Sequence, residues 1–109
     1  MNYGLVLTAR ARADILRNAE WWAENHSSDQ AIAWFDSIYE QLESLRMMPE
    51  RFPLAPENGL VEVEIREMPL GVGSRPSFRA VFMIKPLEVH VLTVRRTSQD
   101  AVTTEDIES

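Results

Sequence analysis

The chain has 109 residues, which is enough for one domain with a buried core and too few for two. Hydrophobic residues make up 45% of the sequence and charged residues 26%, a composition that excludes disordered and fibrous proteins. The formal net charge of −6 argues against nucleic-acid binding that depends on charge alone, because a positive surface normally supplies most of the affinity for phosphate backbones. We therefore expect a single domain over residues 1–109.

The sequence lacks cysteine, a long apolar run and a recognisable secretion signal. Without cysteine there are no disulfides or thiolate metal sites, and without about 18 consecutive apolar residues no membrane-spanning helix is expected. There is also no Gly-rich phosphate-binding loop, no metal-ligand spacing and no nucleophile with a base, which argues against a free-standing metabolic enzyme. We expect a cytoplasmic protein with no cofactor, no metal and no membrane partner.

Charge is unevenly distributed along the chain. Residues 1–60 have a net charge of −4, residues 61–96 of +2, and residues 97–109 of −4. The only net-positive stretch is also rich in β-forming residues, so an anionic partner is expected to meet the protein there.

The first half of the chain predicts a strand and then two helices. Residues 3–7 are a β-prone run, and the hydroxyl of Thr8 can cap a helix that begins at Ala9 and continues to about Asn25. The polar residues 26–29 should end this helix and start a second. Four charged residues of the first helix fall mostly on its polar side: Arg10, Asp14, Arg17 and Glu24.

The second helix, expected to start by Gln30, carries the strongest periodic signal. Its apolar residues recur at steps of three and four: Ala31, Trp34, Phe35, Ile38, Leu42 and Leu45. Prolines at 49, 53 and 56 then force an extended, turn-rich connector. We therefore expect a helical hairpin whose apolar stripe packs against the remainder of the chain.

Three β-prone runs complete the chain, at residues 61–68, 77–84 and 89–94, and the last two are joined by a short turn at residues 85–88. One face of the middle strand is apolar and is expected to receive the helices; it comprises Phe78, Ala80, Phe82 and Ile84. The other face is mixed, which suggests cover by a partner; it comprises Arg79, Val81, Met83 and Lys85. The last ten or so residues are expected to form a short helix or to fray.

These elements, taken in order, resemble the RelE/ParE toxins of type II toxin-antitoxin systems. The resembling segments run from residue 3 to about residue 100 and are Leu7-Thr8, Ala31-Ile32-Ala33-Trp34-Phe35, Leu42-Glu43-Ser44-Leu45, Pro49-Glu50-Arg51, Pro53-Leu54-Ala55-Pro56-Glu57, Glu64-Ile65-Arg66, Phe78-Arg79-Ala80-Val81-Phe82 and Val89-His90-Val91-Leu92-Thr93-Val94-Arg95. The resemblance implies an α+β fold of order β-α-α-β-β-β, with a helical hairpin packed on a small antiparallel sheet. It also implies a growth-inhibiting toxin of the kind linked to plasmid stabilisation. Such a toxin is neutralised by a cognate antitoxin that wraps around it in a toxin-antitoxin hetero-oligomer.

The resemblance leaves the target open, because fold alone does not determine function. RelE-like members cleave messenger RNA on the ribosome, whereas ParE-like members poison DNA gyrase. Cleavage of RNA needs groups that accept and donate a proton beside cations that hold the developing negative charge. The candidates for target contact or catalysis are four cations, Arg66, Arg79, Arg95 and Arg96, and one proton carrier, His90.

These residues could also have purely structural roles. The arginines would then be ion-pair partners across the sheet, and His90 would be an ordinary strand residue. Few proton carriers accompany the cations, which favours a ParE-like gyrase poison. The alternatives are a RelE-like endoribonuclease and an inactive antitoxin-binding homologue.

Overall fold

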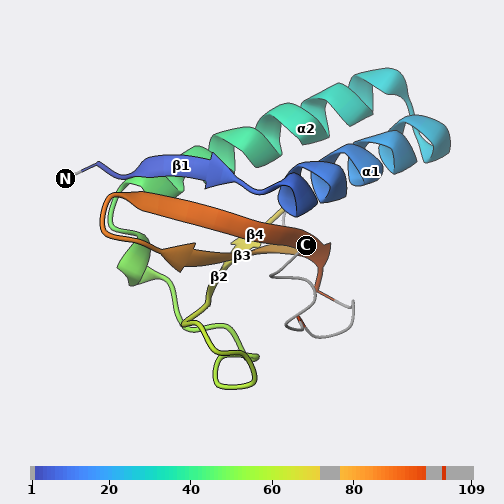
Figure 1. The fold of residues 1–109 in the computed structure, drawn as a ribbon. Helices are drawn as coiled ribbons and strands as arrows, with labels where there is room; N and C mark the ends of the chain where they lie inside the picture. The colour runs from blue at the N-terminus through green and yellow to red at the C-terminus, as the bar shows by residue number, and fades with distance from the viewer. Residues whose placement is uncertain (1, 72–76, 98–101, 103–109) are drawn as a thin grey trace.

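The computed structural model of the chain, shown in Figure 1, describes residues 2–71, 77–97 and 102. Its elements, in order, are β1 (Gly4–Leu7), α1 (Ala9–Asn25), α2 (Ser28–Glu43), two 3-10 turns (Ser44–Arg46 and Pro49–Arg51), β2 (Arg66–Leu70), β3 (Phe78–Ile84) and β4 (Glu88–Arg96). This is the predicted order β-α-α-β-β-β. The short helix or frayed tail expected at the C-terminus lies outside the described residues.

The four strands form one sheet in the order β1-β4-β3-β2. β2 and β3 are antiparallel, as are β3 and β4, whereas β1 lies parallel to β4. The sheet is therefore mixed. The predicted antiparallel pattern holds for the three C-terminal strands, and β1 joins the far edge in the parallel sense because the helical hairpin carries the chain back across the sheet.

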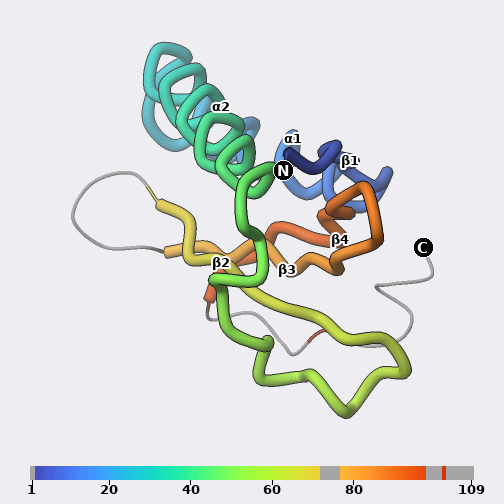
Figure 2. Tube along the Cα trace, turned by 90° about the vertical axis from the view of Figure 1, so that its left-hand side faces the viewer, coloured from blue at the N-terminus to red at the C-terminus, as the bar shows by residue number. Residues whose placement is uncertain are grey.

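Both helices begin at a side-chain cap. The hydroxyl of Thr8 accepts a hydrogen bond from the Ala11 N–H at 3.1 Å, as the sequence predicted, and that of Ser27 accepts one from the Gln30 N–H at 3.1 Å. α2 consequently starts at Ser28, two residues earlier than expected. The helices run side by side over one face of the sheet (Figures 1 and 2).

The main core lies between this hairpin and the sheet. The Trp34 and Phe78 rings meet edge to face with their centroids 5.3 Å apart. The other fully buried side chains of this core are Ala11, Ile15, Ile38, Leu42, Leu45, Leu70, Ala80, Phe82, Val89 and Val91. The apolar face predicted for the middle strand is thus the face that receives the helices.

A second, smaller core lies on the opposite face of the sheet. There Val81 and Leu92 pack against Ala55 and Ile65 of the connector and against Val102. Figure 2 shows the connector on the side of the sheet away from the helices. The expectation that a partner covers this mixed face was therefore wrong in part, because the chain's own connector occupies it.

The strand predicted at residues 61–68 is displaced to Arg66–Leu70. Residues 61–65 instead belong to the connector, where the Ile65 N–H donates to Asn58 Oδ1 at 3.0 Å and the Ile65 carbonyl accepts from Ala55 at 2.9 Å. The alternating Val61, Val63 and Ile65 serve the second core in place of a sheet edge. An apolar alternation suits either arrangement, which explains the wrong boundaries.

A β-bulge interrupts β4 at Leu92. Val81 pairs with Thr93 and Phe82 pairs with Val91, so Leu92 is the extra residue of the bulge. Val89, Val91 and Val94 can therefore all face the main core while Leu92 faces the second one. The bulge marks the region of β4 where α1 replaces β1 as its neighbour.

Candidate functional site

The C-terminal half of β4 extends beyond the end of β1, and α1 supplies the missing hydrogen-bond partners. The Thr8 N–H donates to the Val91 carbonyl at 3.1 Å, and the Thr8 hydroxyl donates to the Leu92 carbonyl at 3.0 Å. Six residues after Thr8, the Asp14 carboxylate accepts from the Val94 N–H at 3.1 Å and from the Thr93 hydroxyl. The start of α1 is thereby fixed against the open edge of β4.

Asp14 also brings two cations to this place. Its side chain is 2% exposed and forms ion pairs with Arg10 at 3.4 Å and with Arg17. The expectation that Asp14 lies on the polar side of the helix was wrong, because that side of α1 faces the strand edge. A buried carboxylate with two guanidinium groups and two β4 donors is well satisfied.

Arg95 and Arg96 complete a cationic cluster, which we define as Arg10, Arg17, Arg95 and Arg96. Arg95 is buried and its Nε donates to Thr93 Oγ1 at 3.4 Å. Arg96 is half-buried on the helical side, where its guanidinium carbon lies 4.7 Å from the Trp21 ring centroid and 5.9 Å from that of Phe78. Two cations from α1 that are paired with Asp14 and two from the end of β4 thus lie at the junction of these elements.

The aromatic residues next to Arg96 form two packed pairs, Trp21 with Trp22 and Trp34 with Phe78, which we call the aromatic cluster. Trp21 packs edge to face on Trp22 with a centroid distance of 5.5 Å, and Trp34 packs on Phe78 at 5.3 Å. Trp22 and Trp34 line one hollow between α1 and α2. Arg96 lies over the two outer members, Trp21 and Phe78, so the cationic cluster and the hollow are connected through these aromatic pairs.

Arg79, a predicted candidate, is engaged within the fold. Its guanidinium forms a two-pronged ion pair with the buried Glu57 and a third contact with Glu67 at 3.0 Å. The hydrogen bonds from Arg79 outweigh the opposing effect of burial and hold the pKa of Glu57 at about 2. Glu57 in turn raises the pKa of Arg79. Since Arg79 lies opposite Arg95 in the sheet, Glu57 and Glu67 also offset the repulsion between these two cations.

The remaining two candidates lie elsewhere. Arg66 pairs with Phe82 in the sheet and donates to the Phe52 carbonyl at 2.7 Å. His90 is half-buried, with its Nε2 3.1 Å from Glu88 Oε1. It precedes Arg95 by five residues, about 17 Å along an extended strand. The structure therefore places Arg79 opposite Arg95 and turns the neighbouring Arg96 towards Trp21 and Phe78, while Arg66 and His90 lie elsewhere on the sheet.

Sequence reasoning missed the contribution of α1 to this site. Arg10, Asp14 and Arg17 follow one another at helical steps of four and three, a spacing that is usual for solvated surface pairs. The pattern carries no sign that Asp14 is buried against β4. The only available signal was that Asp14 is the one acidic residue among three arginines in the first half of the helix.

Within residues 2–71, 77–97 and 102, no group of three or more His, Asp or Glu side chains is placed to hold a metal ion. In that part of the chain, no helix is long and apolar enough to cross a membrane.

Comparison with known families decides the family. The model of the ParE toxin of the type II toxin-antitoxin system parDE matches residues 5–101. The chain belongs to the ParE toxin family. As a type II toxin it has a cognate antitoxin as its partner, and the family and the fold predicted from the sequence are both confirmed.

The fold of this ParE-family chain is also that of a solved structure, described as the chromosomal ParDE TA system from P. aeruginosa. The two align with a TM-score of 0.70 and 24% sequence identity, over 86% of this chain and 95% of that one. A search of curated proteins found no match. At this identity the structural likeness supports the ParE fold, while residue roles depend on the geometry above.

Proposed function

We propose that this ParE-family toxin acts by binding a protein target, DNA gyrase, through the cationic cluster. The observation that carries the proposal is the position of four cations at the junction of α1 and β4, two of them paired with a carboxylate that is already fully engaged. Asp14 accepts from Thr93 and Val94 and pairs with Arg10 and Arg17, so it has no capacity left to act as a proton acceptor. The cluster can attract and orient an anionic surface.

The separation of His90 from the cationic cluster argues against the ribonuclease alternative. A general base must lie within hydrogen-bond reach of the proton that it removes, at roughly 2.6–3.2 Å or through one water. His90 is about 17 Å along the strand from Arg95 and pairs with Glu88 instead. The proton carrier and the cations that RNA cleavage would combine are thus at different places on β4.

The cognate antitoxin has one favoured surface. From the sequence alone, the antitoxin could bind either the helical hairpin or the mixed face of the sheet. The connector covers the sheet face, whereas the hairpin keeps large apolar side chains at the surface: Leu16, Trp21 and Ile32 are 54%, 39% and 60% exposed. We assign the antitoxin to the hairpin, next to the cationic cluster.

Induced expression tests the proposal directly. The wild-type chain is expected to arrest growth with breaks in cellular DNA and a DNA-damage response. Codon-positioned cleavage of translated messages would instead support the ribonuclease. Normal growth would contradict both and leave an inactive antitoxin-binding homologue.

A double variant locates the site. Arg17→Gln with Arg96→Gln removes two cations from the cluster, and we expect growth arrest to be lost while the circular dichroism spectrum and melting temperature stay close to wild type. The matched control is Arg12→Gln with Arg46→Gln, which removes two charges outside the cluster and should remain toxic. A folded Arg17→Gln/Arg96→Gln chain that still arrests growth would rule out the cluster as the contact surface.

A further inference from the structure

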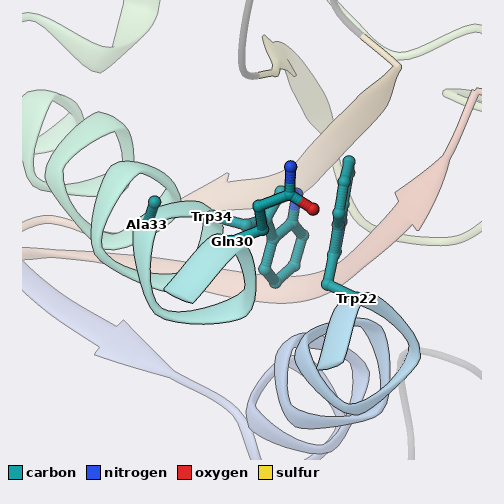
Figure 3. A pocket seen from close by; sticks show the side chains of 4 residues that line it. All are labelled: Trp22, Gln30, Ala33 and Trp34. Carbon is teal, nitrogen blue, oxygen red and sulfur yellow. The ribbon is translucent and has the colours of Figure 1, made fainter. Parts of the chain in front are cut away.

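The hollow on the Trp22 side of the hairpin has the size of a single side chain. It is lined by Trp22 from α1 and by Gln30, Ala33 and Trp34 from α2, which Figure 3 shows approaching from the neighbouring helices. Its volume is about 210 Å³. Pockets for small molecules usually measure roughly 300–1,000 Å³, so this hollow suits one side chain of a protein partner better.

Two buried donors at this hollow lack acceptors. The indole N–H groups of Trp22 and Trp34 are both buried, and neither has a hydrogen-bond partner within the part of the chain that the structure describes. Trp34 as a whole is only 2% exposed. A buried donor without an acceptor is unfavourable, so an oxygen atom that reached these groups on binding would be stabilised there.

An acidic ridge borders the same hollow. Asp29, Ala33, Asp36 and Glu40 follow one another along α2 at steps of four, three and four, and all are exposed. Ala33 is also part of the hollow's lining. Residues 18–43 contain six acidic residues and no Lys or Arg, so the surface around the hollow is strongly negative.

The hollow on the other side of the hairpin is different in kind. It is lined by Ala19, Ala31, Ile32 and Phe35 and has a volume of about 190 Å³. These side chains provide apolar area without a donor or acceptor. Only the Trp22 side combines an apolar cavity, unpaired donors and adjacent negative charge, the combination that fixes both the position and the chemistry of an anchor.

We infer that the Trp22/Trp34 hollow is the anchor site for a basic segment of the cognate antitoxin. The segment inserts one apolar side chain, presents an oxygen atom to the two indole N–H groups, and places Lys or Arg residues along the ridge of Asp29, Asp36 and Glu40. The inference depends on the proposed function, in that it assigns the antitoxin to the hairpin. It adds the chemistry of the antitoxin segment and the residues of the toxin that bind this segment.

Indole resonances provide the most direct test. The full-length chain contains three tryptophans, and their indole N–H signals can be assigned with Trp21→Phe and Trp22→Phe. In ¹⁵N-labelled toxin bound to its purified antitoxin, the Trp22 and Trp34 signals are expected to move downfield and to exchange more slowly with solvent. Trp21 does not line the hollow, so its indole N–H is not expected to gain an acceptor from the anchor. Unchanged Trp22 and Trp34 signals in the complex would overturn the inference.

Two pairs of variants test the cavity and the charge by titration calorimetry. Ala33→Leu fills the hollow and should weaken antitoxin binding by about tenfold or more, whereas Ala13→Leu, the same change at an exposed site of α1, should not. Asp29→Asn, Asp36→Asn and Glu40→Gln together should weaken binding about tenfold at low salt and flatten its salt dependence. The control removes three other exposed carboxylates, with Glu50→Gln, Glu62→Gln and Glu64→Gln.

The possible outcomes separate the two proposals. If the antitoxin does not bind the wild-type chain, the proposed partnership itself fails. If it binds wild type and all variants alike, the partnership stands and the anchor site is refuted. Trp22 and Trp34 signals that shift with the concentration of the chain alone would show that a second copy occupies the hollow, which also refutes the antitoxin assignment.

Discussion

Glu57 links three segments of the chain that are far apart in sequence. It lies in the connector, binds the guanidinium of Arg79 on β3, and accepts a hydrogen bond from the Val102 N–H at 2.9 Å. Its side chain is almost completely shielded from solvent, so both oxygens depend on these partners. The charge on this one residue therefore holds the second core together.

This dependence predicts a stability change in acid. The pKa of Glu57 falls on folding from 4.5 to about 2. The ion pair thus stabilises the fold fully above pH 4.5, and that stabilisation is lost as the pH falls towards 2. We expect wild type to lose roughly 3 kcal/mol of unfolding free energy through this group, a loss that Glu57→Gln should not show. Urea denaturation across the pH range measures it, with the exposed Glu62→Gln as control; parallel pH profiles for wild type and Glu57→Gln would contradict the assignment.

The residues of the site illustrate what a sequence can reveal. Arg95 and Arg96 could be proposed as candidates from the sequence, because they follow one another at the end of a β-prone run in the net-positive stretch, and their contact with a target stays a prediction. The engagement of Arg79 could not, because its partner Glu57 lies 22 residues away in an irregular connector. Whether an arginine is free for a target is decided by such long-range pairs, and no local pattern reports them.

At the level of elements, α1 has a double role: it covers the sheet and it completes the edge of β4. Asp14 carries out the second role through the Thr93 hydroxyl and the Val94 N–H, in the stretch that β1 does not reach. The same carboxylate positions Arg10 and Arg17. The structural and the functional contribution of α1 therefore meet at one side chain.

Asp14→Ala should consequently be strongly destabilising. It leaves the Val94 N–H and the Thr93 hydroxyl buried without their acceptor and removes the partner of two cations. We expect a loss of roughly 2–4 kcal/mol in unfolding free energy, measured by urea denaturation. Asp36→Ala, at an exposed site of α2, is the matched control and should stay within about 0.5 kcal/mol of wild type. A loss for Asp14→Ala as small as that of the control would show that the edge contact is unimportant.

The helical hairpin was predictable and the sheet only partly so, for a physical reason. A 3.6-residue period and capping hydroxyls such as Thr8 are local properties, and both helices appeared where these signals placed them. Strand pairing is a long-range property. The alternation of Val61, Val63 and Ile65 was read as a strand, and the structure uses it to fill the second core. The parallel pairing of β1 with β4 likewise follows from the crossover and has no local signal.

For the whole molecule, the separation of charge is the property that bears on function. The cationic cluster occupies one junction, whereas residues 18–43 are purely acidic among their charged residues and the chain as a whole carries −6. A local positive surface on a negative molecule can select a shaped partner, but it binds extended phosphate backbones poorly.

We therefore expect the purified chain to show no appreciable affinity for naked duplex DNA or single-stranded RNA at physiological salt, with any dissociation constant no tighter than about 10⁻⁴ M. Fluorescence anisotropy with labelled oligonucleotides measures this. The exposed-carboxylate variant Asp29→Asn/Asp36→Asn/Glu40→Gln reports how far the acidic ridge contributes. Tight binding by wild type, with a steep dependence on salt, would favour an RNA-directed toxin over a gyrase poison.

The aromatic cluster has a thermodynamic consequence for how the antitoxin neutralises the toxin and how it dissociates from it. Arg96, proposed to meet the target, contacts Trp21 and Phe78, and these two pack on Trp22 and Trp34, which line the hollow proposed to hold the antitoxin. Under these two proposals, occupation of one site shifts the affinity of the other by a factor that must be equal in both directions. Gyrase would then loosen the antitoxin's hold by the same factor by which the antitoxin lowers the affinity for gyrase. Neutralisation would then be an equilibrium, and a higher concentration of gyrase would shift it towards toxin that has lost its antitoxin.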